Sequence, residues 1–378
     1  MKRITFAVMC VLILSAANAT IRVVNNNNPS PGQYSDLQVA INAATAGDTI
    51  YVTGSPNVYS GIILVNKKLI IIGTGHKPQK VNPVVSKLNQ ISFTDKAASG
   101  SQVIGLEMDY LSIVVDSVAD LIIKRNKFNV GLWSQQSGNI NADLNNVSSG
   151  YRFLRLTIEG NYFAYGGVDI NFGYYEAYQN VYIRNNVFVG DLYGFVSNNA
   201  PPINCYVTNN LFCGVGIIGY NGYFQNCYVQ SNIFIRNGAN YGNSDPIQSS
   251  NVTAIEWRYN LSYGFATSSI PNNGNVGTGS YGNLNNVAPQ FTNFTTSALG
   301  PDTWGYQYDF TPAPGSPLIN AGNDGSDIGP TGNPFVIYNK YGIPNIPQIR
   351  SFSIISPANA TVAPGSTLQV NIISTIKK

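Results

Sequence analysis

One pattern of apolar and polar positions recurs along the middle of the chain. Two apolar residues separated by one residue are followed by two further residues, an asparagine, any residue and a phenylalanine. The clear copies occupy residues 121–128, 156–163, 181–188, 205–212 and 227–234, and residues 255–262 are a weaker copy. Alternation with a period of two is typical of a β-strand with one buried face. Each copy therefore predicts a strand followed by a turn.

The spacing of the copies predicts how these strands are arranged. Their asparagines, at positions 126, 161, 186, 210, 232 and 260, are separated by 35, 25, 24, 22 and 28 residues. The first interval is longer because residues 134–150, rich in Asn and Ser, are predicted to be an inserted loop. A single coil cannot bury its inner face, but coils stacked about 4.8 Å apart can. We therefore predict an all-β chain that folds as a parallel β-helix. A propeller or sandwich would need hairpins, and Asn-Gly hairpin turns are sparse.

The recurring residues predict ladders along the axis of this solenoid. Asparagine tolerates the left-handed backbone of a tight turn, and its amide group both donates and accepts hydrogen bonds. A buried ladder is predicted for Asn126, Asn161, Asn186, Asn210, Asn232 and Asn260. A second ladder, six residues earlier, is predicted for Asn180, Asn204 and Asn226. An inner aromatic stack is predicted for Phe128, Phe163, Phe188, Phe212 and Phe234.

The two ends of the repeat region carry a resemblance to known proteins. Residues 35–44 predict a short amphipathic helix with Ser35 as its N-cap, which would cap the N-terminal end of the solenoid. Residues 46–52 read Ala-Gly-Asp-Thr-Ile-Tyr-Val, and residues 66–73 read Asn-Lys-Lys-Leu-Ile-Ile-Ile-Gly. Together these segments resemble the opening of secreted bacterial right-handed parallel β-helix proteins of the pectate-lyase-like superfamily. Residues 315–322 and 327–329 resemble their closing segment, which we expect at the other end.

The resemblance covers roughly residues 30–335 and implies a right-handed parallel β-helix with an N-terminal capping helix. It does not imply one activity, because the superfamily includes lyases, hydrolases, epimerases, adhesins and proteins without known chemistry.

The chain is predicted to have three parts. Residues 1–19 have a basic start, an apolar run and the sequence Ala-Asn-Ala, and we interpret them as a secretory signal peptide. The alternative, a membrane anchor, is disfavoured because the run is shorter than the ~20 residues that span a bilayer. Residues 20–335 are assigned to the β-helix and residues 336–378 to a C-terminal tail. Within the tail, residues 354–370 resemble the first strands of a bacterial immunoglobulin-like module, so the tail is either a truncated module or a segment that resembles one. We expect a secreted or cell-surface protein without a membrane span, and a monomer.

Charge narrows the range of partners. Charged residues make up 10% of the chain, and the net charge of +3 falls to +1 without Lys2 and Arg3 of the predicted signal peptide. This gives no electrostatic basis for binding a nucleic acid. His76 is the only histidine, which disfavours His-rich metal sites and a Ser-His-Asp triad. A nearly neutral surface suits a polysaccharide or a cell-surface glycan.

The outward positions of the repeated strands supply the candidate binding residues. One column contains Tyr182, Tyr206 and Tyr228, and the neighbouring column contains Arg184. Sugar rings stack on aromatic side chains, so this stripe is a candidate glycan-binding surface; the alternative is a tyrosine ladder that only stiffens the sheet. Asp169 also alternates outward, on the strand after the asparagine turn, and we expect it on a different sheet from Arg184.

Candidate catalytic residues are harder to find. Lyases resembling pectate lyase use a cluster of Asp or Glu to hold Ca²⁺ and an Arg or Lys as base, and hydrolases of this fold use two or three close Asp residues. In the central repeats the acidic residues are scattered, so we assign no catalytic residue, metal site or cofactor; Ca²⁺ enters only if the protein is a lyase. The leading hypothesis is a protein that binds polysaccharide or is displayed on cell-surface material. The alternatives are a carbohydrate-active enzyme, such as a Ca²⁺-dependent polysaccharide lyase or a glycoside hydrolase, and a purely structural rod.

Three cysteines remain after removal of the predicted signal peptide. Cys205 and Cys227 occupy the same place in adjacent repeats, and Cys213 lies between them. Stacked Cα atoms about 4.8 Å apart would permit a disulfide, but two parallel side chains give it poor geometry. We therefore expect free thiols.

Overall fold

The computed structural model describes residues 19–76, 84–113, 118–129, 140–143, 154–164, 168–171, 179–189, 195–198, 203–213, 217–220, 224–236, 247–249, 252–265, 270, 281–294, 309–332, 342–344, 348–356 and 369–375. Residues 1–18 of the predicted signal peptide and most of the predicted loop 134–150 lie outside these ranges. No helix in the described residues is long and apolar enough to cross a membrane.

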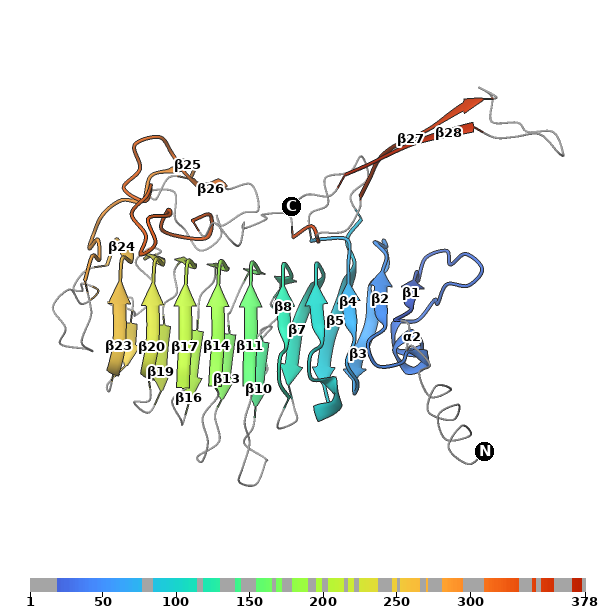
Figure 1. Ribbon diagram of the computed structural model, residues 1–378, viewed down its shortest axis with the longest axis horizontal. Helices are drawn as coiled ribbons and strands as arrows, with labels where there is room; N and C mark the ends of the chain where they lie inside the picture. The colour runs from blue at the N-terminus through green and yellow to red at the C-terminus, as the bar shows by residue number, and fades with distance from the viewer. Residues whose placement is uncertain are drawn as a thin grey trace, which may run out of the picture.

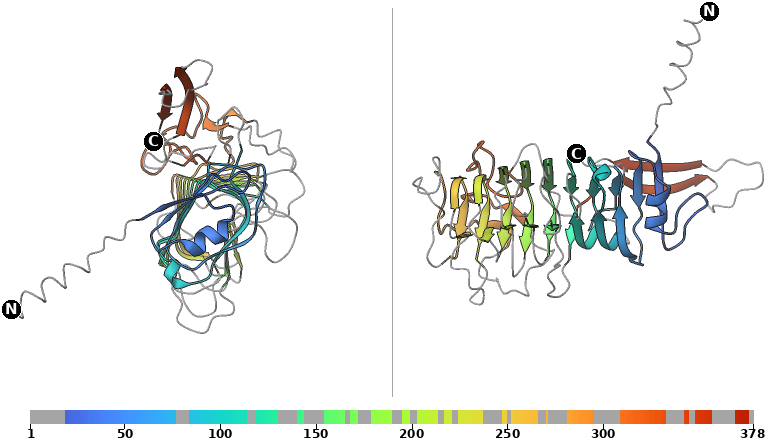
Figure 2. Two further views of the ribbon diagram at one scale, coloured as in Figure 1. Left: turned by 90° about the vertical axis from the view of Figure 1, so that its right-hand side faces the viewer. Right: turned by 90° about the horizontal axis from the view of Figure 1, so that it is seen from below.

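Parallel strands build two long sheets that face each other across one interior (Figures 1 and 2). Strands that follow each other in the first sheet are separated in the chain by strands of the second, as in a solenoid. The first sheet has ten strands, in the order β1 (Ile21–Val24), β2 (Thr49–Val52), β4 (Ile70–Ile72), β6 (Gln102–Ile104), β8 (Ile122–Lys124), β11 (Leu154–Glu159), β14 (Gln179–Arg184), β17 (Ile203–Thr208), β20 (Phe224–Gln230) and β23 (Val252–Arg258).

The second sheet has 14 strands and divides at one long strand. It begins with β3 (Tyr59–Val65), β5 (Lys87–Phe93) and β7 (Glu107–Ile113). The first half of β7 pairs with one branch, β9 (Lys127–Phe128), β12 (Tyr162–Phe163), β15 (Val187–Val189), β18 (Leu211–Cys213), β21 (Ile233–Ile235) and β24 (Leu261–Tyr263). Its second half pairs with the other branch, β10 (Ile140–Asp143), β13 (Val168–Asn171), β16 (Phe195–Asn198), β19 (Ile217–Tyr220) and β22 (Ile247–Ser249). The coils after β7 therefore contain three strands, and the predicted parallel β-solenoid is confirmed.

A short helix, α2 (Leu37–Ala43), packs Leu37, Ala40 and Ile41 into the core. Its N-cap is Asp36, which accepts a hydrogen bond from the backbone N–H of Val39 at 2.8 Å, so the prediction of Ser35 was wrong. Aspartate caps a helix as well as serine does, and Ser35 and Asp36 are adjacent in the chain. A single turn of 3-10 helix, η1 (Lys96–Ala98), precedes β6.

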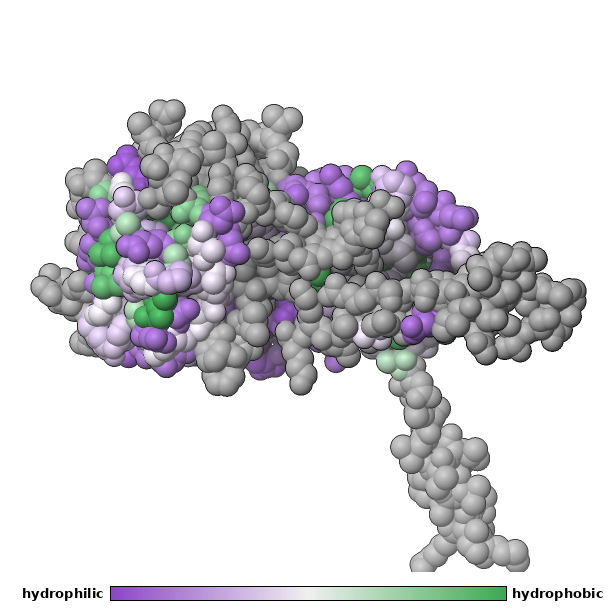
Figure 3. All heavy atoms as spheres, turned by 90° about the horizontal axis from the view of Figure 1, so that it is seen from above, coloured by the Kyte–Doolittle hydropathy of each residue, from purple (hydrophilic) through white to green (hydrophobic). Residues whose placement is uncertain are grey.

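The C-terminal segment, residues 309–332 and 342–344, lies along the outside of the solenoid, not across its far end (Figure 1). The backbone of Pro330 accepts a hydrogen bond from Asn185, and that of Ile343 accepts one from Arg125, so the segment crosses several coils. Leu318 and Ile328 pack on an outward apolar column of the second sheet, which consists of Tyr162, Val187, Leu211, Ile233 and Leu261. The residues that we expected to close the solenoid thus cover its side. Seen from this side, the described surface mixes hydrophilic and hydrophobic residues (Figure 3).

Two small antiparallel sheets complete the described chain. β25 (Phe291–Asn293) pairs with β26 (Asp309–Pro312), and β27 (Gln348–Ser356) pairs with β28 (Gln369–Thr375). The second pair lies in the predicted C-terminal tail, but residues 357–368 between its strands lie outside the described ranges. The assignment of this tail to a truncated immunoglobulin-like module stays a prediction.

The predicted asparagine ladder is confirmed, and Asn283 adds one rung. Each side-chain amide from Asn126 to Asn260 donates to the Oδ1 atom of the next rung at 2.9–3.2 Å. Each amide, including that of Asn283, also donates to a strand carbonyl of the preceding coil at 2.7–2.9 Å. Each Oδ1 atom from Asn161 onward also accepts the backbone N–H of the preceding rung at 2.9–3.0 Å. These partners offset the cost of burying a column of amides, since a buried polar group is unfavourable mainly when it is unpaired.

The left-handed backbone does not lie at the ladder residues themselves. It lies one residue earlier, at Arg125 (φ 56°), Asn185 (55°), Asn209 (55°), Ser231 (54°) and Tyr259 (53°), and at the glycines Gly160 and Gly282. The prediction that the ladder asparagines supply this conformation was therefore wrong. The ladder residue is selected by its amide, and the preceding residue makes the turn.

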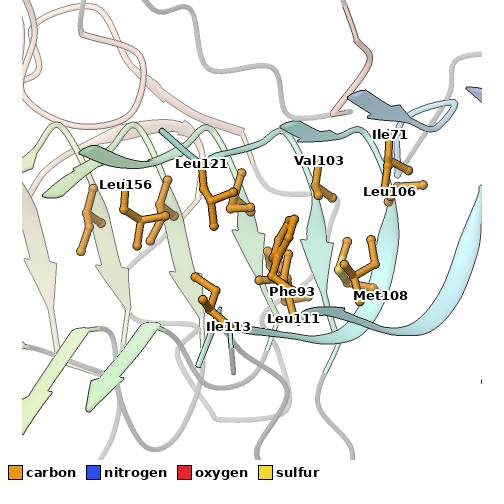
Figure 4. Packing of buried hydrophobic residues seen from close by; sticks show 14 of the residues in the cluster. Ile71, Phe93, Val103, Leu106, Met108, Leu111, Ile113, Leu121 and Leu156 are labelled. Carbon is orange, nitrogen blue, oxygen red and sulfur yellow. The ribbon is translucent and has the colours of Figure 1, made fainter. Parts of the chain in front are cut away.

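The predicted phenylalanine stack is also confirmed. Its ring centroids are 4.6–4.9 Å apart and the rings are within 10° of parallel. All five side chains are fully buried. Toward the N-terminal end, Val103 of the first sheet faces Phe93 and Met108 of the second (Figure 4). One apolar core therefore follows the rod along its length.

Acid should weaken the N-terminal coil through Asp48. Burial alone raises the pKa of this carboxyl, but hydrogen bonds from the backbone N–H groups of Thr20 and Thr45 and from Arg22 outweigh it and hold the pKa at about 2. The folded pKa lies below the unfolded value of about 3.9. The contribution of ionised Asp48 to the free energy of unfolding is therefore complete above about pH 4 and is lost as the pH falls toward 2. We expect Asp48→Asn to be less stable than the wild type at pH 7, with a difference that shrinks between pH 4 and pH 2. Urea unfolding across this range checks it, and a difference independent of pH would contradict it.

Candidate functional site

The outer face of the ten-stranded sheet contains the two columns that the repeats predicted. Strand register places Tyr206 beside Tyr182 and Tyr228, and places Glu159 between Lys124 and Arg184. The first column contains Ile122, Thr157, Tyr182, Tyr206, Tyr228 and Glu256. The second contains Lys124, Glu159, Arg184, Thr208, Gln230 and Arg258. Parallel strands in register bring side chains from six coils together here, with three tyrosines on successive strands.

The three tyrosines form a ladder of partly exposed, nearly parallel rings. The ring centroids of Tyr182 and Tyr206 are 5.1 Å apart, those of Tyr206 and Tyr228 are 4.9 Å apart, and the interplanar angles are 9° and 7°. The Arg184 guanidinium lies 5.9 Å from the ring centroid of Tyr182. The ring faces inside the ladder therefore contact one another, and a ligand would meet ring edges and hydroxyl groups. This geometry does not suit the predicted stacking of a sugar on the middle ring.

The hydroxyl group of Tyr206 stays protonated at neutral pH. Partial burial, together with the neighbouring phenols of Tyr182 and Tyr228, raises the pKa of Tyr206 above its ordinary value. A protonated phenol both donates and accepts hydrogen bonds. The tyrosine ladder thus offers hydrogen-bonding groups at a spacing close to the distance between coils.

A cluster of charges lies beside the tyrosine ladder. Glu159 is 3% exposed, and its carboxylate forms ion pairs with Lys124 and with Arg184, whose Nη2 lies 2.8 Å from Oε2. Arg184 also donates from Nε to the same oxygen at 2.8 Å. A carboxylate on an outward strand position can be buried at acceptable cost when cations pair with it from both adjacent rungs. The sequence pattern that indicates this cluster is the alternating sign of the charges at three successive positions of the column, Lys124, Glu159 and Arg184.

A third ion pair lies at the last coils of the same face. Arg258 Nη2 lies 2.7 Å from Glu256 Oε2, and its guanidinium carbon lies 4.8 Å from the ring centroid of Tyr281. The face therefore carries neutral hydrogen-bonding groups flanked by paired charges.

Asp169 is placed away from these columns. Its strand, β13, belongs to the second sheet, where Asp169 pairs in register with Asn141 and Val196, whereas Arg184 lies on β14 of the first sheet. The prediction that they lie on different sheets is confirmed. The side chain of Asp169 lies outside what the structure describes.

The described residues hold no group of three or more His, Cys, Asp or Glu side chains close enough to share a metal ion. His76 is 4% exposed, and its ring centroid lies 6.4 Å from that of Tyr162, beside the C-terminal segment. Asp324 and Asp327, in the segment that resembles the family's closing part, accept hydrogen bonds from the backbone N–H groups of Ser326 and Asn320, as turn residues do.

The cysteines are free and buried, as expected. Cys205 and Cys227 are register partners on β17 and β20, and Cys213 lies on β18. Burial raises the pKa of the Cys213 and Cys227 thiols, which keeps them protonated and unreactive. We expect three free thiols per mature chain when denatured, unreduced protein is titrated with a thiol reagent. A single free thiol would show that two of the cysteines are paired.

Comparison with known proteins adds no assignment. No protein-family model matches the chain, and no curated protein matches it.

Proposed function

We propose that this protein is a secreted right-handed parallel β-helix of the pectate-lyase-like type that binds polysaccharide or cell-surface glycan. The binding surface is the outer face of the ten-stranded sheet, and the tyrosine ladder of Tyr182, Tyr206 and Tyr228 is its centre. The observation that carries the proposal is this ladder, a regular row of partly exposed phenols on successive coils.

The chemistry of the face supports a glycan more than a charged polymer. Thr208 and Gln230 continue the row of hydrogen-bonding groups beside the phenols. The charged side chains nearby, Glu159, Arg184 and Arg258, are in ion pairs. Sugar hydroxyls donate and accept in the same way as these neutral side chains do.

The handedness and the cap of the solenoid belong to the same proposal. Connections between parallel strands of one sheet are right-handed in nearly all proteins, which supports a right-handed coil. For the cap, Gln38 of α2 exchanges hydrogen bonds with both backbone groups of Leu64, at 2.7 and 3.2 Å. Lys67 donates to the carbonyls of Ile41, Asn42 and Ala44 at 3.1–3.4 Å. The Gln38 contacts satisfy backbone groups of β3, and the Lys67 contacts satisfy carbonyls at the C-terminal end of α2, so both support α2 as the cover of the first coil.

The test is glycan-array binding by the mature protein, followed by the same array with a triple variant, Y182F/Y206F/Y228F. Phenylalanine keeps the stacked rings and removes the hydroxyl groups, so the fold is retained while the proposed contacts are lost. We expect retention on at least one polysaccharide class and a loss of at least about tenfold in affinity for the variant, since each hydrogen bond contributes about 0.5–1.5 kcal/mol. The matched control is Tyr110→Phe, which removes a partly exposed phenol from the second sheet and should bind as the wild type does.

Two results would overturn the proposal. Retention of no glycan would favour a structural rod, and equal retention of the wild type and the triple variant would place the contact elsewhere. A polysaccharide lyase is one of the enzymatic alternatives. Incubation with uronic-acid polysaccharides and Ca²⁺, monitored by the ultraviolet absorbance of unsaturated products, would reveal it.

A further inference from the structure

The tyrosine ladder has a property that is independent of glycan binding. Its rings are held in register by parallel strand pairing, so the ring of Tyr206 stacks on that of Tyr228. Their centroids are 4.9 Å apart and the rings are 7° from parallel. The chain also holds a contrasting pair, Tyr259 and Tyr281, with centroids 5.4 Å apart and rings at 79°.

We propose that Tyr182, Tyr206 and Tyr228 are a site of oxidative phenol coupling, where adjacent coils become joined by a dityrosine bond. The bond forms between ring carbons ortho to the hydroxyl groups. In a parallel stack the ortho carbons of neighbouring rings face each other, whereas in the edge-to-face pair Tyr259–Tyr281 one ring presents its edge. Partial exposure leaves the phenols within reach of a small oxidant.

The reaction requires a one-electron oxidant with a peroxide as the terminal electron acceptor. Each of two phenols gives up one electron and its hydroxyl proton, and becomes a phenoxyl radical. The two unpaired electrons then form one carbon–carbon bond. Each bonded ortho carbon loses its hydrogen as a proton, each oxygen regains a proton, and both rings become aromatic again. Overall, two tyrosines and one hydrogen peroxide give one dityrosine and two waters. With persulfate as the oxidant, two tyrosines and one persulfate give one dityrosine and two hydrogen sulfate ions.

Coupling at this site should be intramolecular. The two rings are already neighbours, so their effective concentration far exceeds that of rings on separate molecules. The yield per chain should therefore be independent of protein concentration, and the product should remain a monomer. The new bond would link two coils that are 22 or 24 residues apart at the ladder asparagines.

The experiment uses the mature chain with photo-excited ruthenium tris-bipyridyl and persulfate, which are small enough to reach a partly exposed ring. Dityrosine is measured by its fluorescence and located by mass spectrometry of chymotryptic peptides. Chymotrypsin is needed because no Lys or Arg lies between Tyr206 and Tyr228. We expect cross-linked peptides that join Tyr206 to Tyr182 or to Tyr228, in a monomeric product and at the same yield per chain after dilution.

Two variants sharpen the result. Tyr206→Phe keeps the ring but leaves the phenols of Tyr182 and Tyr228 two coils apart, so the yield of cross-links at the ladder should fall at least about tenfold because proximity is lost. Tyr259→Phe removes a phenol from the edge-to-face pair and should leave that yield unchanged. A free tyrosine peptide that couples under the same conditions verifies the oxidant. The proposal is overturned if ladder cross-links are absent, if they survive in Tyr206→Phe, or if coupling occurs only between chains.

Discussion

Replacing Asn210 with leucine should lower the free energy of unfolding by about 3–5 kcal/mol, since each orphaned buried polar group costs about 1–3 kcal/mol. Leucine has nearly the same shape as asparagine but makes none of its hydrogen bonds. The variant loses the donor to the carbonyl of Ile183 and to Asn232 Oδ1, and the acceptor for the backbone N–H of Asn186. All these groups belong to fully buried residues. Denaturant unfolding measured by circular dichroism checks the value.

The control for Asn210 is Asn204→Gly in the second ladder. Asn204 is exposed, and its amide donates a long hydrogen bond of 3.4 Å to Asn180. Its backbone is left-handed (φ 57°), a conformation that glycine adopts without strain. We expect a change within about 0.5 kcal/mol, the usual range for a surface site. If Asn204→Gly were as destabilising as Asn210→Leu, burial of the ladder would not be the reason for its effect.

The second large effect is expected for Phe188→Ala, which should lower the free energy of unfolding by about 3–5 kcal/mol. Phe188 is fully buried and stacks on Phe163 at 4.6 Å and on Phe212 at 4.8 Å. Alanine removes both ring contacts and leaves a cavity between two coils that strand pairing prevents from closing. The same denaturant series measures it.

Tyr206→Ala is the matched comparison, because it removes a ring from an outer stack with nearly the same spacing. Tyr206 is partly exposed, so we expect a loss of about 1 kcal/mol or less, the range of cross-strand side-chain pairs. Equal losses for the two variants would contradict the assignment of the phenylalanine stack to the core.

The register of the solenoid was predictable because one short pattern recurs in successive coils. An asparagine and a phenylalanine at fixed offsets specify which residues stack, and every neighbour in the two outward columns followed from that alignment. The ladder turn was less predictable. Asparagine suits both the left-handed position and the amide ladder, and only the backbone shows that Asn185 serves the first purpose and Asn186 the second.

The path of the C-terminal segment was missed, although the repeats contain a signal for it. The residue between the asparagine and the phenylalanine is Lys127 in the first copy but Tyr162, Val187 and Leu211 in the following copies. An outward strand position that becomes apolar over successive coils predicts a cover, and Leu318 and Ile328 provide it.

The candidate site was predictable in its residues but not in its geometry. Counting along the repeat placed Tyr182, Tyr206 and Tyr228 in one column, but it could not show that their faces contact one another. That outcome depends on side-chain rotamers, which the alternation of residues does not specify. For the same reason the burial of Glu159 between two cations was not expected.

Hydrogen bonds between successive asparagines keep the buried amide groups of adjacent coils paired. A double-mutant cycle of Asn186→Leu and Asn210→Leu, measured by denaturant unfolding, tests this claim most directly because the two amides are bonded at 3.0 Å. We predict that the double variant is more stable than the sum of the single losses implies, by about 1–3 kcal/mol, since replacing both partners leaves fewer orphaned groups. Additivity within about 0.5 kcal/mol would contradict the claim, because two residues without a direct interaction behave in that way.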